Sequence, residues 1–224
     1  MMPHIDVLIR TKRKSVSIHI TPQGNLVVRA PVKCSNEKIL SIVKEKEQWI
    51  ILHQQRIKNN LAVHQELINL KQVMFLGTTY PLQYNDAIKQ ISITENALIV
   101  PYKYLGAKLS GQVSRWFKIV AEKILFDRIR YFATLMQLDY GELKLSNAKG
   151  SWGSCDNKSN IKLNWRLIML PHSLIDYVVV HELAHILEFN HSKNFWLIVK
   201  SVLPDYKERR NQVKKGDFLL QLYR

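Results

Sequence analysis

Hydrophobic and polar residues alternate over two short stretches near the start of the chain, a pattern typical of β-strands. Apolar residues occupy every second position of residues 16–20, and a second apolar stretch follows at residues 26–28. Over residues 35–57 the apolar positions instead recur every three or four residues, which predicts a helix with a serine as its N-cap. Strand patterns return at residues 75–84 and 90–100. The first part of the chain is therefore expected to be rich in β-structure, with one helix.

The pattern changes after a stretch that contains proline and glycine, around residues 101–111, which is the best candidate for a domain boundary. Beyond it the pattern predicts a long amphipathic helix, two strands and two further helices, over residues 113–132, 143–148, 161–170, 173–189 and 193–203. We predict an α+β fold with a β-rich N-terminal subdomain, residues 1–104, followed by a second domain, residues 105–224.

Three histidines and one glutamate in the second domain have the spacing of a metal site. His181 and His185 are four residues apart in a predicted helix, so both imidazoles lie on one face and can reach the same ion. His191 follows six residues later, beyond the expected end of the helix, where a turn of the chain can bring a third nitrogen to the ion. Glu182 stands beside the first ligand, where a carboxylate can take a proton from metal-activated water.

This ligand set favours zinc. Three neutral imidazoles leave the full charge of the ion uncompensated, which lowers the pKa of a bound water to about 7. Nitrogen ligands favour zinc over magnesium or calcium. Three protein ligands also leave one coordination position open for water, whereas closed structural zinc sites have four. The expected cofactor is therefore a catalytic Zn2+ ion held by His181, His185 and His191.

A hydrolase of this kind also needs a donor for the negative charge that develops on the substrate oxygen. Arg166 ranks first because it is permanently charged and lies on the predicted strand that precedes the metal-binding helix. A structural ion pair with Glu188 or Asp176 is its alternative role. Asn164 is a second candidate donor, which could instead satisfy the end of the strand, and Lys149 and Tyr177 are further candidates. The predicted catalytic residues are therefore Glu182, Arg166 and Asn164.

The metal motif and its surroundings resemble the zincin metallopeptidases of the YgjP-like and SprT-like kind. The resemblance is strong over residues 144–196 and weaker over the N-terminal strands. It is carried by Trp152-Gly153-Ser154-Cys155, Asn164-Trp165-Arg166-Leu167, the segment from His181 to His185, and Asn190-His191-Ser192 with Phe195-Trp196. It implies zinc at the three histidines and catalysis by Glu182. It also implies a zincin-like domain, in which the active-site helix packs on a small mixed sheet and a strand lies along the cleft.

Charge and composition restrict the partners. The net charge is +15, but the excess is spread, since residues 1–110 carry 15 basic and 7 acidic residues and residues 111–224 carry 18 and 11. This distribution supports nucleic-acid binding only weakly, because such binding needs the basic residues gathered on one face. No apolar run has the roughly 18 residues needed to cross a membrane. With two cysteines and no export signal, the expected location is the reducing cytoplasm.

Three functions are compatible with these residues. The first is hydrolysis of peptide bonds in a peptide or protein substrate that pairs with the strand at residues 161–167. The second is cleavage of a nucleotide phosphoanhydride, as in a nucleoside triphosphate pyrophosphohydrolase of the UTP type, although no glycine-rich phosphate loop is found. The third is a nucleic-acid-associated protease directed at crosslinks. We predict the first, a zinc-dependent metallopeptidase, because the family resemblance implies it.

Overall fold

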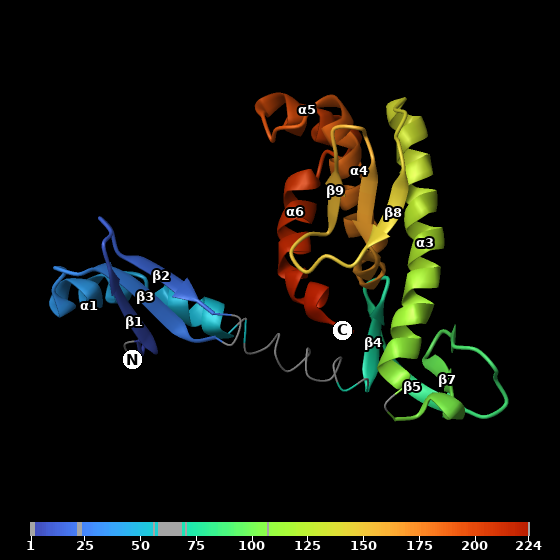
Figure 1. Cartoon of the computed structure of the whole chain (residues 1–224), viewed down its shortest axis with the longest axis horizontal. Coiled ribbons are helices and arrows are strands. Elements are labelled where there is room, and N and C mark those ends of the chain that lie inside the picture. Colours follow the sequence, from blue (N-terminus) through green and yellow to red (C-terminus); the bar gives the residue numbers. More distant parts are fainter. Residues whose placement is uncertain are drawn as a thin grey trace. The chain divides into compact units, whose positions relative to one another are not determined.

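A computed structural model describes residues 3–21, 24–55, 57, 69, 71–106 and 108–223 of the chain. The chain forms two compact units, Met1–Gln65 and Glu66–Arg224, which can be followed by colour in Figure 1. Within the described ranges, we find no helix that combines the length and the apolar character needed to span a membrane.

The N-terminal unit is built on a three-stranded sheet in the order β1-β3-β2. Its strands are β1 (Val7–Thr11), β2 (Ser17–Ile20) and β3 (Leu26–Pro31). The central strand β3 runs parallel to β1 and antiparallel to β2. The two strands predicted at residues 16–20 and 26–28 are therefore confirmed, and they pair directly with each other.

A helical segment packs against this sheet. Ser35 caps helix α1 (Asn36–Glu45) by accepting a hydrogen bond from the backbone N–H of Lys38, as the serine at this position predicted. The helix is interrupted at residue 46 and resumes over residues 47–55. The sheet and the helices share one apolar core, made of Leu26, Val28, Ala30, Ile39, Val43 and Ile50.

The second unit begins with a four-stranded sheet in the order β4-β5-β7-β6. Its strands are β4 (Gln72–Phe75), β5 (Thr78–Asn85), β6 (Ser92–Ile93) and β7 (Leu98–Pro101), with the 3-10 turn η1 (Tyr102–Tyr104) after them. The turn between β4 and β5 is tied to the rest of the unit, because the N–H groups of Leu76 and Gly77 donate to the carbonyl oxygens of residues 168–169. Gly77 has a φ of 84°, and a Cβ there would lie 2.6 Å from Pro171. This close approach requires glycine.

The long helix α3 (Leu109–Met136) runs along one side of the second unit, next to β8 (Figure 1). Its buried residues recur every three or four positions, the spacing of one helical face. They include Val113, Phe117, Ala121, Leu125, Ile129 and Phe132. The helix ends where Gln137 adopts the left-handed conformation, with a φ of 54°. The amphipathic helix predicted over residues 113–132 is confirmed.

A second, mixed sheet has the order β8-β10-β9. Its strands are β8 (Leu143–Ser146), β9 (Gly153–Cys155) and β10 (Ile161–Asn164). The sequence pattern predicted that β10 would continue to residue 170, but the strand ends at Asn164. There the side-chain oxygen of Asn164 accepts the backbone N–H of Arg166 at 3.1 Å and starts the 3-10 helix η2 (Trp165–Met169). This local cap turns the chain out of the sheet and toward the next helix.

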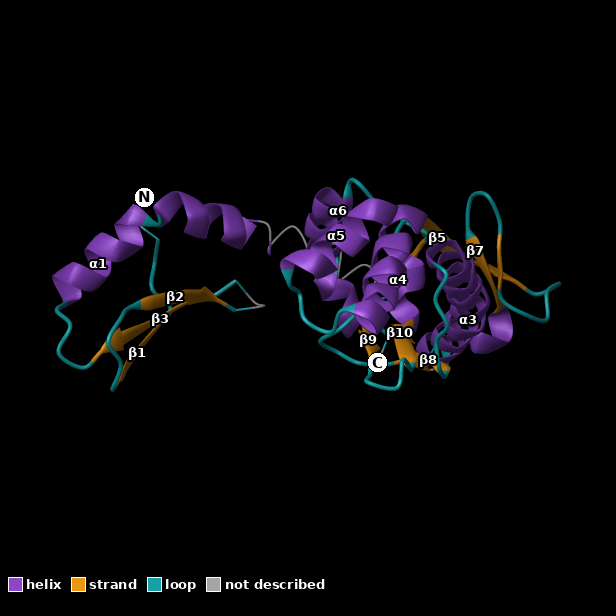
Figure 2. Ribbon diagram, turned by 90° about the horizontal axis from the view of Figure 1, so that it is seen from above, coloured by secondary structure: helices purple, strands orange, loops and turns teal. Residues whose placement is uncertain are grey.

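The remaining elements are helical: α4 (His172–Leu187), α5 (Lys193–Val202), α6 (Tyr206–Lys215) and the 3-10 helix η3 (Asp217–Gln221). Helix α4, which carries His181 and His185, packs on strands β9 and β10 and contacts α3, α5 and α6. Figure 2 shows it between the other helices and the mixed sheet. The α+β class is confirmed, and so is the packing of the histidine-bearing helix on a small mixed sheet.

The division into compact units falls between residues 65 and 66, whereas the sequence pattern placed a boundary between residues 104 and 105. The difference has a physical reason. Val73 of β4 and Leu98 and Val100 of β7 are fully buried in the same apolar core as Val113 and Phe117 of α3. The four-stranded sheet is therefore part of the core of the second unit. Periodicity alone reveals strands but not the core in which they are buried.

Candidate metal centre

The structure brings the three histidines together. The ring centroids of His181 and His185, one turn apart on α4, are 4.9 Å from each other. His191 lies in the turn between α4 and α5, with its centroid 4.9 Å from that of His181 and 4.8 Å from that of His185. One nitrogen from each ring can be chosen so that all three lie within 4.8 Å of one another.

The geometry fits a single metal ion. The Nε2 atoms of His181 and His191 are 3.0 Å apart, and two nitrogens bound to one tetrahedral zinc at 2.0–2.1 Å lie about 3.3 Å apart. The Nδ1 atom of His185 lies 3.1 Å from the carbonyl oxygen of Glu188. Because a carbonyl only accepts hydrogen bonds, this Nδ1 carries the proton and Nε2 keeps the lone pair that binds a metal.

A tight turn fixes the position of His191. Helix α4 ends at Leu187, two residues before the predicted end. The N–H of Ser192 then donates to the carbonyl of Asn190 at 2.7 Å, and the Ser192 hydroxyl accepts the N–H of Phe195 at 3.3 Å, which caps α5. The buried ring of Phe195 lies with its centroid 4.6–4.9 Å from all three imidazole rings. This cap and this aromatic ring hold the third histidine against the other two.

Burial favours the neutral form of two of these histidines. Burial, and next the neighbouring imidazoles of His185 and His191, lower the pKa of His181 to about 3. Burial also lowers the pKa of His191. A metal binds only the neutral form of imidazole, and the lowered pKa values of His181 and His191 favour that form.

Glu182 is buried, with 6% of its surface exposed, and lies directly beneath strand β9. A Cβ added at Gly153 of β9 would come within 2.6 Å of the Glu182 carboxylate and 2.7 Å of its Cγ. The strand can therefore cross the side chain only because position 153 is glycine. Burial raises the pKa of Glu182 to about 8. A cation at the histidines would favour the ionised carboxylate.

The first prediction concerns the pH dependence of the metal-free protein. Burial raises the pKa of Glu182 from 4.5 to about 8 on folding, so the unfolded chain releases this proton first. The free energy of unfolding of the metal-free protein should therefore fall as the pH rises from 4.5 to about 8. The slope that Glu182 contributes is at most about 1.4 kcal/mol per pH unit. Urea unfolding of chelator-treated protein at pH 5 and pH 7.5 measures this. Glu182→Gln should be more stable than wild type at pH 7.5, and identical pH profiles would contradict the prediction.

The second prediction concerns Gly153. Gly153→Ala should lower kcat/KM for hydrolysis by about 10- to 100-fold, because the added methyl group displaces the Glu182 carboxylate. The bound metal should be retained, since none of the three histidines changes. Gly150→Ala is the matched control in the same segment, because a Cβ there meets no atom within 4 Å. Steady-state kinetics and metal content would be measured for both, and an unaffected Gly153→Ala enzyme would refute the steric argument.

The structure places Asn164 in structural contacts. The side chain is fully buried, and its amide donates to the carbonyl oxygens of Ala148 at 2.7 Å and Ser151 at 3.1 Å. Its own oxygen accepts the N–H of Arg166. Both ends of the Asn164 amide therefore bind backbone groups of the chain between β8 and η2. These contacts favour the second role considered for Asn164, which is to satisfy the end of the strand.

Arg166 is likewise directed into the protein, with 2% of its surface exposed. Its Nε donates to the carbonyl of Leu222 at 2.7 Å, Nη2 donates to that of Tyr223 at 3.4 Å, and Nη1 donates to Asn147 at 2.6 Å. Asp176, one of its predicted ion-pair partners, is bound by an arginine of α3 instead. The described contacts of Arg166 hold the C-terminal segment of the chain and favour a structural role.

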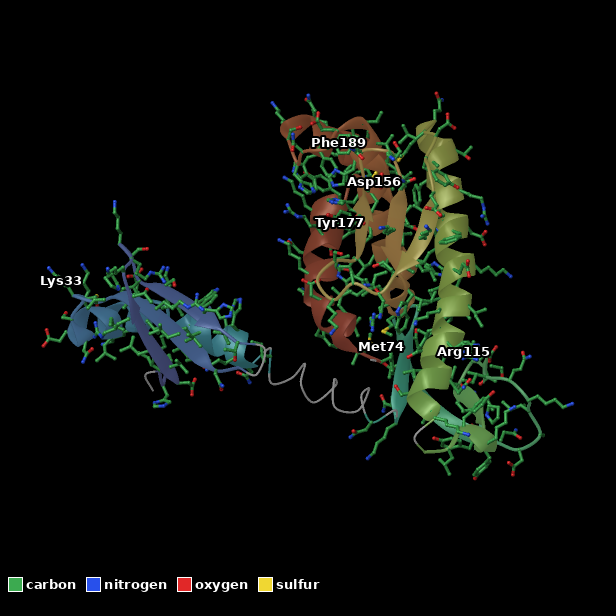
Figure 3. All side chains as sticks on the ribbon, viewed as in Figure 1. Lys33, Met74, Arg115, Asp156, Tyr177 and Phe189 are labelled. Carbon is green, nitrogen blue, oxygen red and sulfur yellow. The ribbon has the colours of Figure 1, made fainter. Side chains whose placement is uncertain are left out.

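A third prediction separates the structural role of Arg166 from a catalytic one. Arg166→Ala should reduce the free energy of unfolding by roughly 2–4 kcal/mol, because buried carbonyl groups lose their donors. The turnover rate, measured well below the unfolding temperature, should change less than about threefold. Arg115→Ala, at an exposed arginine of α3 labelled in Figure 3, is the matched control. Turnover that falls by about two orders of magnitude while stability is unchanged would restore the catalytic assignment.

The sequence did not assign roles to Gly153 and Phe195, which support the site through packing. Gly153 lies between the strands that the pattern predicted, so β9 itself was not predicted, although a glycine near a strand often marks the close approach of another group. That signal indicates a contact but not its partner. Phe195 follows Ser192 at the spacing of a helix cap, which predicts α5 but not the packing of its ring on three histidines.

Comparison with known proteins identifies the family to which the chain belongs. A family model described as "YgjP-like, metallopeptidase domain" matches residues 14–216. This match extends over most of the chain, so the chain belongs to the YgjP-like metallopeptidase family. It is therefore an enzyme, a metal-dependent peptidase by family, and the resemblance found in the sequence is confirmed. The search of curated proteins gave no match.

Two solved structures are similar to part of the chain. One is the metallopeptidase zymogen of Pyrococcus abyssi abylysin, with 21% identity and a TM-score of 0.38 over 41% of this chain and 93% of that chain. The other is the metallopeptidase zymogen of Methanocaldococcus jannaschii jannalysin, with 16% identity and a TM-score of 0.38 over 41% of this chain and 95% of that chain.

Proposed function

We propose that the chain is a zinc-dependent metallopeptidase with His181, His185 and His191 as metal ligands and Glu182 as the general base. The observation that carries the proposal is the convergence of three imidazoles, two from α4 and one from the turn after it, beside the buried carboxylate of Glu182 on α4. A zinc ion there would have three nitrogen ligands and one open position, the arrangement of hydrolytic zinc sites. Membership of a metallopeptidase family supports both the metal and the peptide substrate.

Each group then has a defined task. When bound, zinc supplies a Lewis acid that polarises the peptide carbonyl and lowers the pKa of water. Glu182 accepts a proton from the attacking water and returns it to the leaving amine. Tyr177 lies one turn before His181, with a ring-centroid distance of 5.8 Å. Burial raises the pKa of Tyr177 to about 12, so its hydroxyl keeps its proton and can donate a hydrogen bond to the charged oxygen.

We infer that the substrate peptide pairs with β9. The sequence placed this role on residues 161–167, but β10 is already paired on both edges, by β8 and by β9. Strand β9 is at the edge of this sheet and crosses over Glu182. An extended peptide can add to such an edge through its main chain, which would place a peptide bond beside the carboxylate.

The thiol of Cys155 at the end of β9 has no role in this chemistry. Burial, and next the nearby carboxyl groups of Glu182 and Asp156, raise its pKa to about 11. A thiol with such a pKa is protonated at neutral pH and is a poor nucleophile. This supports catalysis by activated water rather than by an enzyme-bound sulfur.

The nucleotide and nucleic-acid alternatives gain no support from the family, and a direct comparison separates them. Metal-loaded wild type and Glu182→Gln would each be incubated with a mixed peptide library and with a panel of nucleoside triphosphates that includes UTP. We expect new peptide termini with wild type alone, detected by mass spectrometry. Phosphate or pyrophosphate release that depends on Glu182, without peptide cleavage, would replace the peptidase by the pyrophosphohydrolase. A chelator-treated wild type controls for contaminating enzymes.

A further inference from the structure

A basic depression lies beside the third histidine. It has a volume of about 320 Å³ and is formed by the side chains of α5 and α6. The residues that line it are Trp196, Tyr206, Lys207, Arg210 and Asn211. Two of them are cations, one is an amide and two are aromatic, a combination suited to an anion with an apolar stem.

An aromatic stack connects this depression to the metal centre. The ring of Trp196 lies nearly parallel to that of His191, with a centroid distance of 5.6 Å and an interplanar angle of 20°. The ring of Tyr206 is also nearly parallel to that of Trp196, with a centroid distance of 5.3 Å and an interplanar angle of 16°. The guanidinium of Arg210 sits 4.6 Å from the centre of the Trp196 ring. The indole ring of Trp196 therefore lies between a molecule bound in the depression and His191, the proposed metal ligand.

The two cations of the depression have no carboxylate partner among the described residues. The nearby carboxylates of α6 are engaged by other groups: Asp205 pairs with Arg209 at 2.9 Å, and Glu208 accepts a hydrogen bond from Gln212 at 3.1 Å. Arg210 and Lys207 are exposed and retain their full hydrogen-bonding capacity.

We propose that the depression formed by Trp196, Tyr206, Lys207, Arg210 and Asn211 is a substrate subsite that binds a carboxylate. The proposal rests on the peptidase function proposed above. Arg210 would bind both carboxylate oxygens through its planar fork, and Lys207 would add a second positive charge. Trp196 and Tyr206, which line the depression, would contact the carbon atoms behind the carboxylate. The carboxylate comes either from an acidic side chain close to the cleaved bond or from the free C-terminus of a short peptide.

The test measures binding in the full chain rather than turnover. Fluorescence anisotropy of zinc-loaded Glu182→Gln would compare three labelled peptides with one common core. The first has an internal glutamate and an amidated end, the second is neutral with a free C-terminal carboxylate, and the third is neutral and amidated. At about 0.15 M salt, one of the first two should bind at least tenfold more tightly than the third. Which of the two binds tightly identifies the source of the carboxylate.

Variants of the depression locate the effect. In the Glu182→Gln background, Arg210→Gln should reduce the advantage of the charged peptide to less than twofold and leave the neutral peptide unaffected. Arg210→Lys should keep part of the advantage. Lys215→Gln, an exposed cation on the same helix that does not line the depression, should keep all of it. Equal binding of the three peptides, or an advantage that survives Arg210→Gln, would overturn the subsite.

Failure of the subsite and failure of the peptidase function are distinguishable. Selective binding that depends on Arg210, without cleavage of any peptide by wild type, would sink the proposed peptidase function and leave the anion site standing. Cleavage of peptides by wild type without regard to charge, together with equal binding, would support the peptidase function and overturn the subsite.

Discussion

Replacing Glu182 by glutamine is expected to slow peptide hydrolysis by on the order of 1,000-fold, while the bound metal is retained. Glutamine has the shape of glutamate, so it fills the same buried space beneath Gly153 of β9. It cannot take a proton from water, and the loss therefore reports the general base alone. The measurement is single-turnover kinetics on a peptide that wild type cleaves, with metal content determined on the same preparation.

Glu188→Gln is the matched control for this substitution. Glu188 is on the same chain segment and contributes its backbone carbonyl, not its carboxylate, to the orientation of His185. Its replacement should leave the turnover rate within a factor of about three. A Glu182→Gln enzyme that keeps a tenth or more of the wild-type rate would remove Glu182 from the role of general base.

Replacing His185 by alanine is expected to weaken metal binding by more than about 100-fold. Loss of a group that only orients a ligand already costs 10- to 100-fold in affinity, and His185 is proposed as a ligand itself. The purified variant should contain less than a tenth of the metal of wild type and show no hydrolysis. Metal removal should also lower the Tm of wild type, because a ligand of the folded state stabilises it.

The control for this variant lies on the same helix. His172→Ala changes an exposed histidine at the start of α4 and should keep both the metal and the Tm shift on chelation. Circular dichroism of the His185→Ala protein checks that the fold persists, since the buried apolar residues of α4 are unchanged. A variant that binds metal as tightly as wild type would exclude His185 from the ligand set.

The histidines could be predicted from the sequence because their relation is local. His181 and His185 share a helical face by periodicity alone, and His191 is close enough along the chain that one turn brings it to them. The apolar residues between them indicated a buried helix, and α4 is buried. The family followed from the same short motifs, and the family model confirms it over residues 14–216.

Contacts between distant residues could not be predicted in this way. Arg166 stands two residues after a capping asparagine, and its hydrogen bonds to Leu222 and Tyr223 join positions more than 50 residues apart. From the sequence alone, a charged residue close to a metal motif, such as Arg166, suggests a catalytic role. The end of β10 at Asn164 was also missed. The apolar pattern continues beyond this residue, but the Asn164 side chain caps the following 3-10 helix and so ends the strand.

The placement of β9 over Glu182 and of Arg210 beside His191 also lay outside the reach of periodicity. Strand β9 has only three residues, too few to show alternation. Arg210 belongs to a basic, polar helix whose sequence reads as a solvated surface. Only the stack of His191, Trp196 and Tyr206 reveals that one end of this helix borders the metal centre.

The central claim is that His181, His185 and His191 hold one zinc ion, and anomalous diffraction at the zinc absorption edge tests it most directly. Crystals of the protein purified without added metal would be measured on both sides of the edge. We predict a single anomalous peak at 2.0–2.1 Å, the usual zinc–nitrogen distance, from one nitrogen of each histidine. A well-ordered site with no peak among the three rings, or a stoichiometric peak elsewhere in the chain, would contradict the claim.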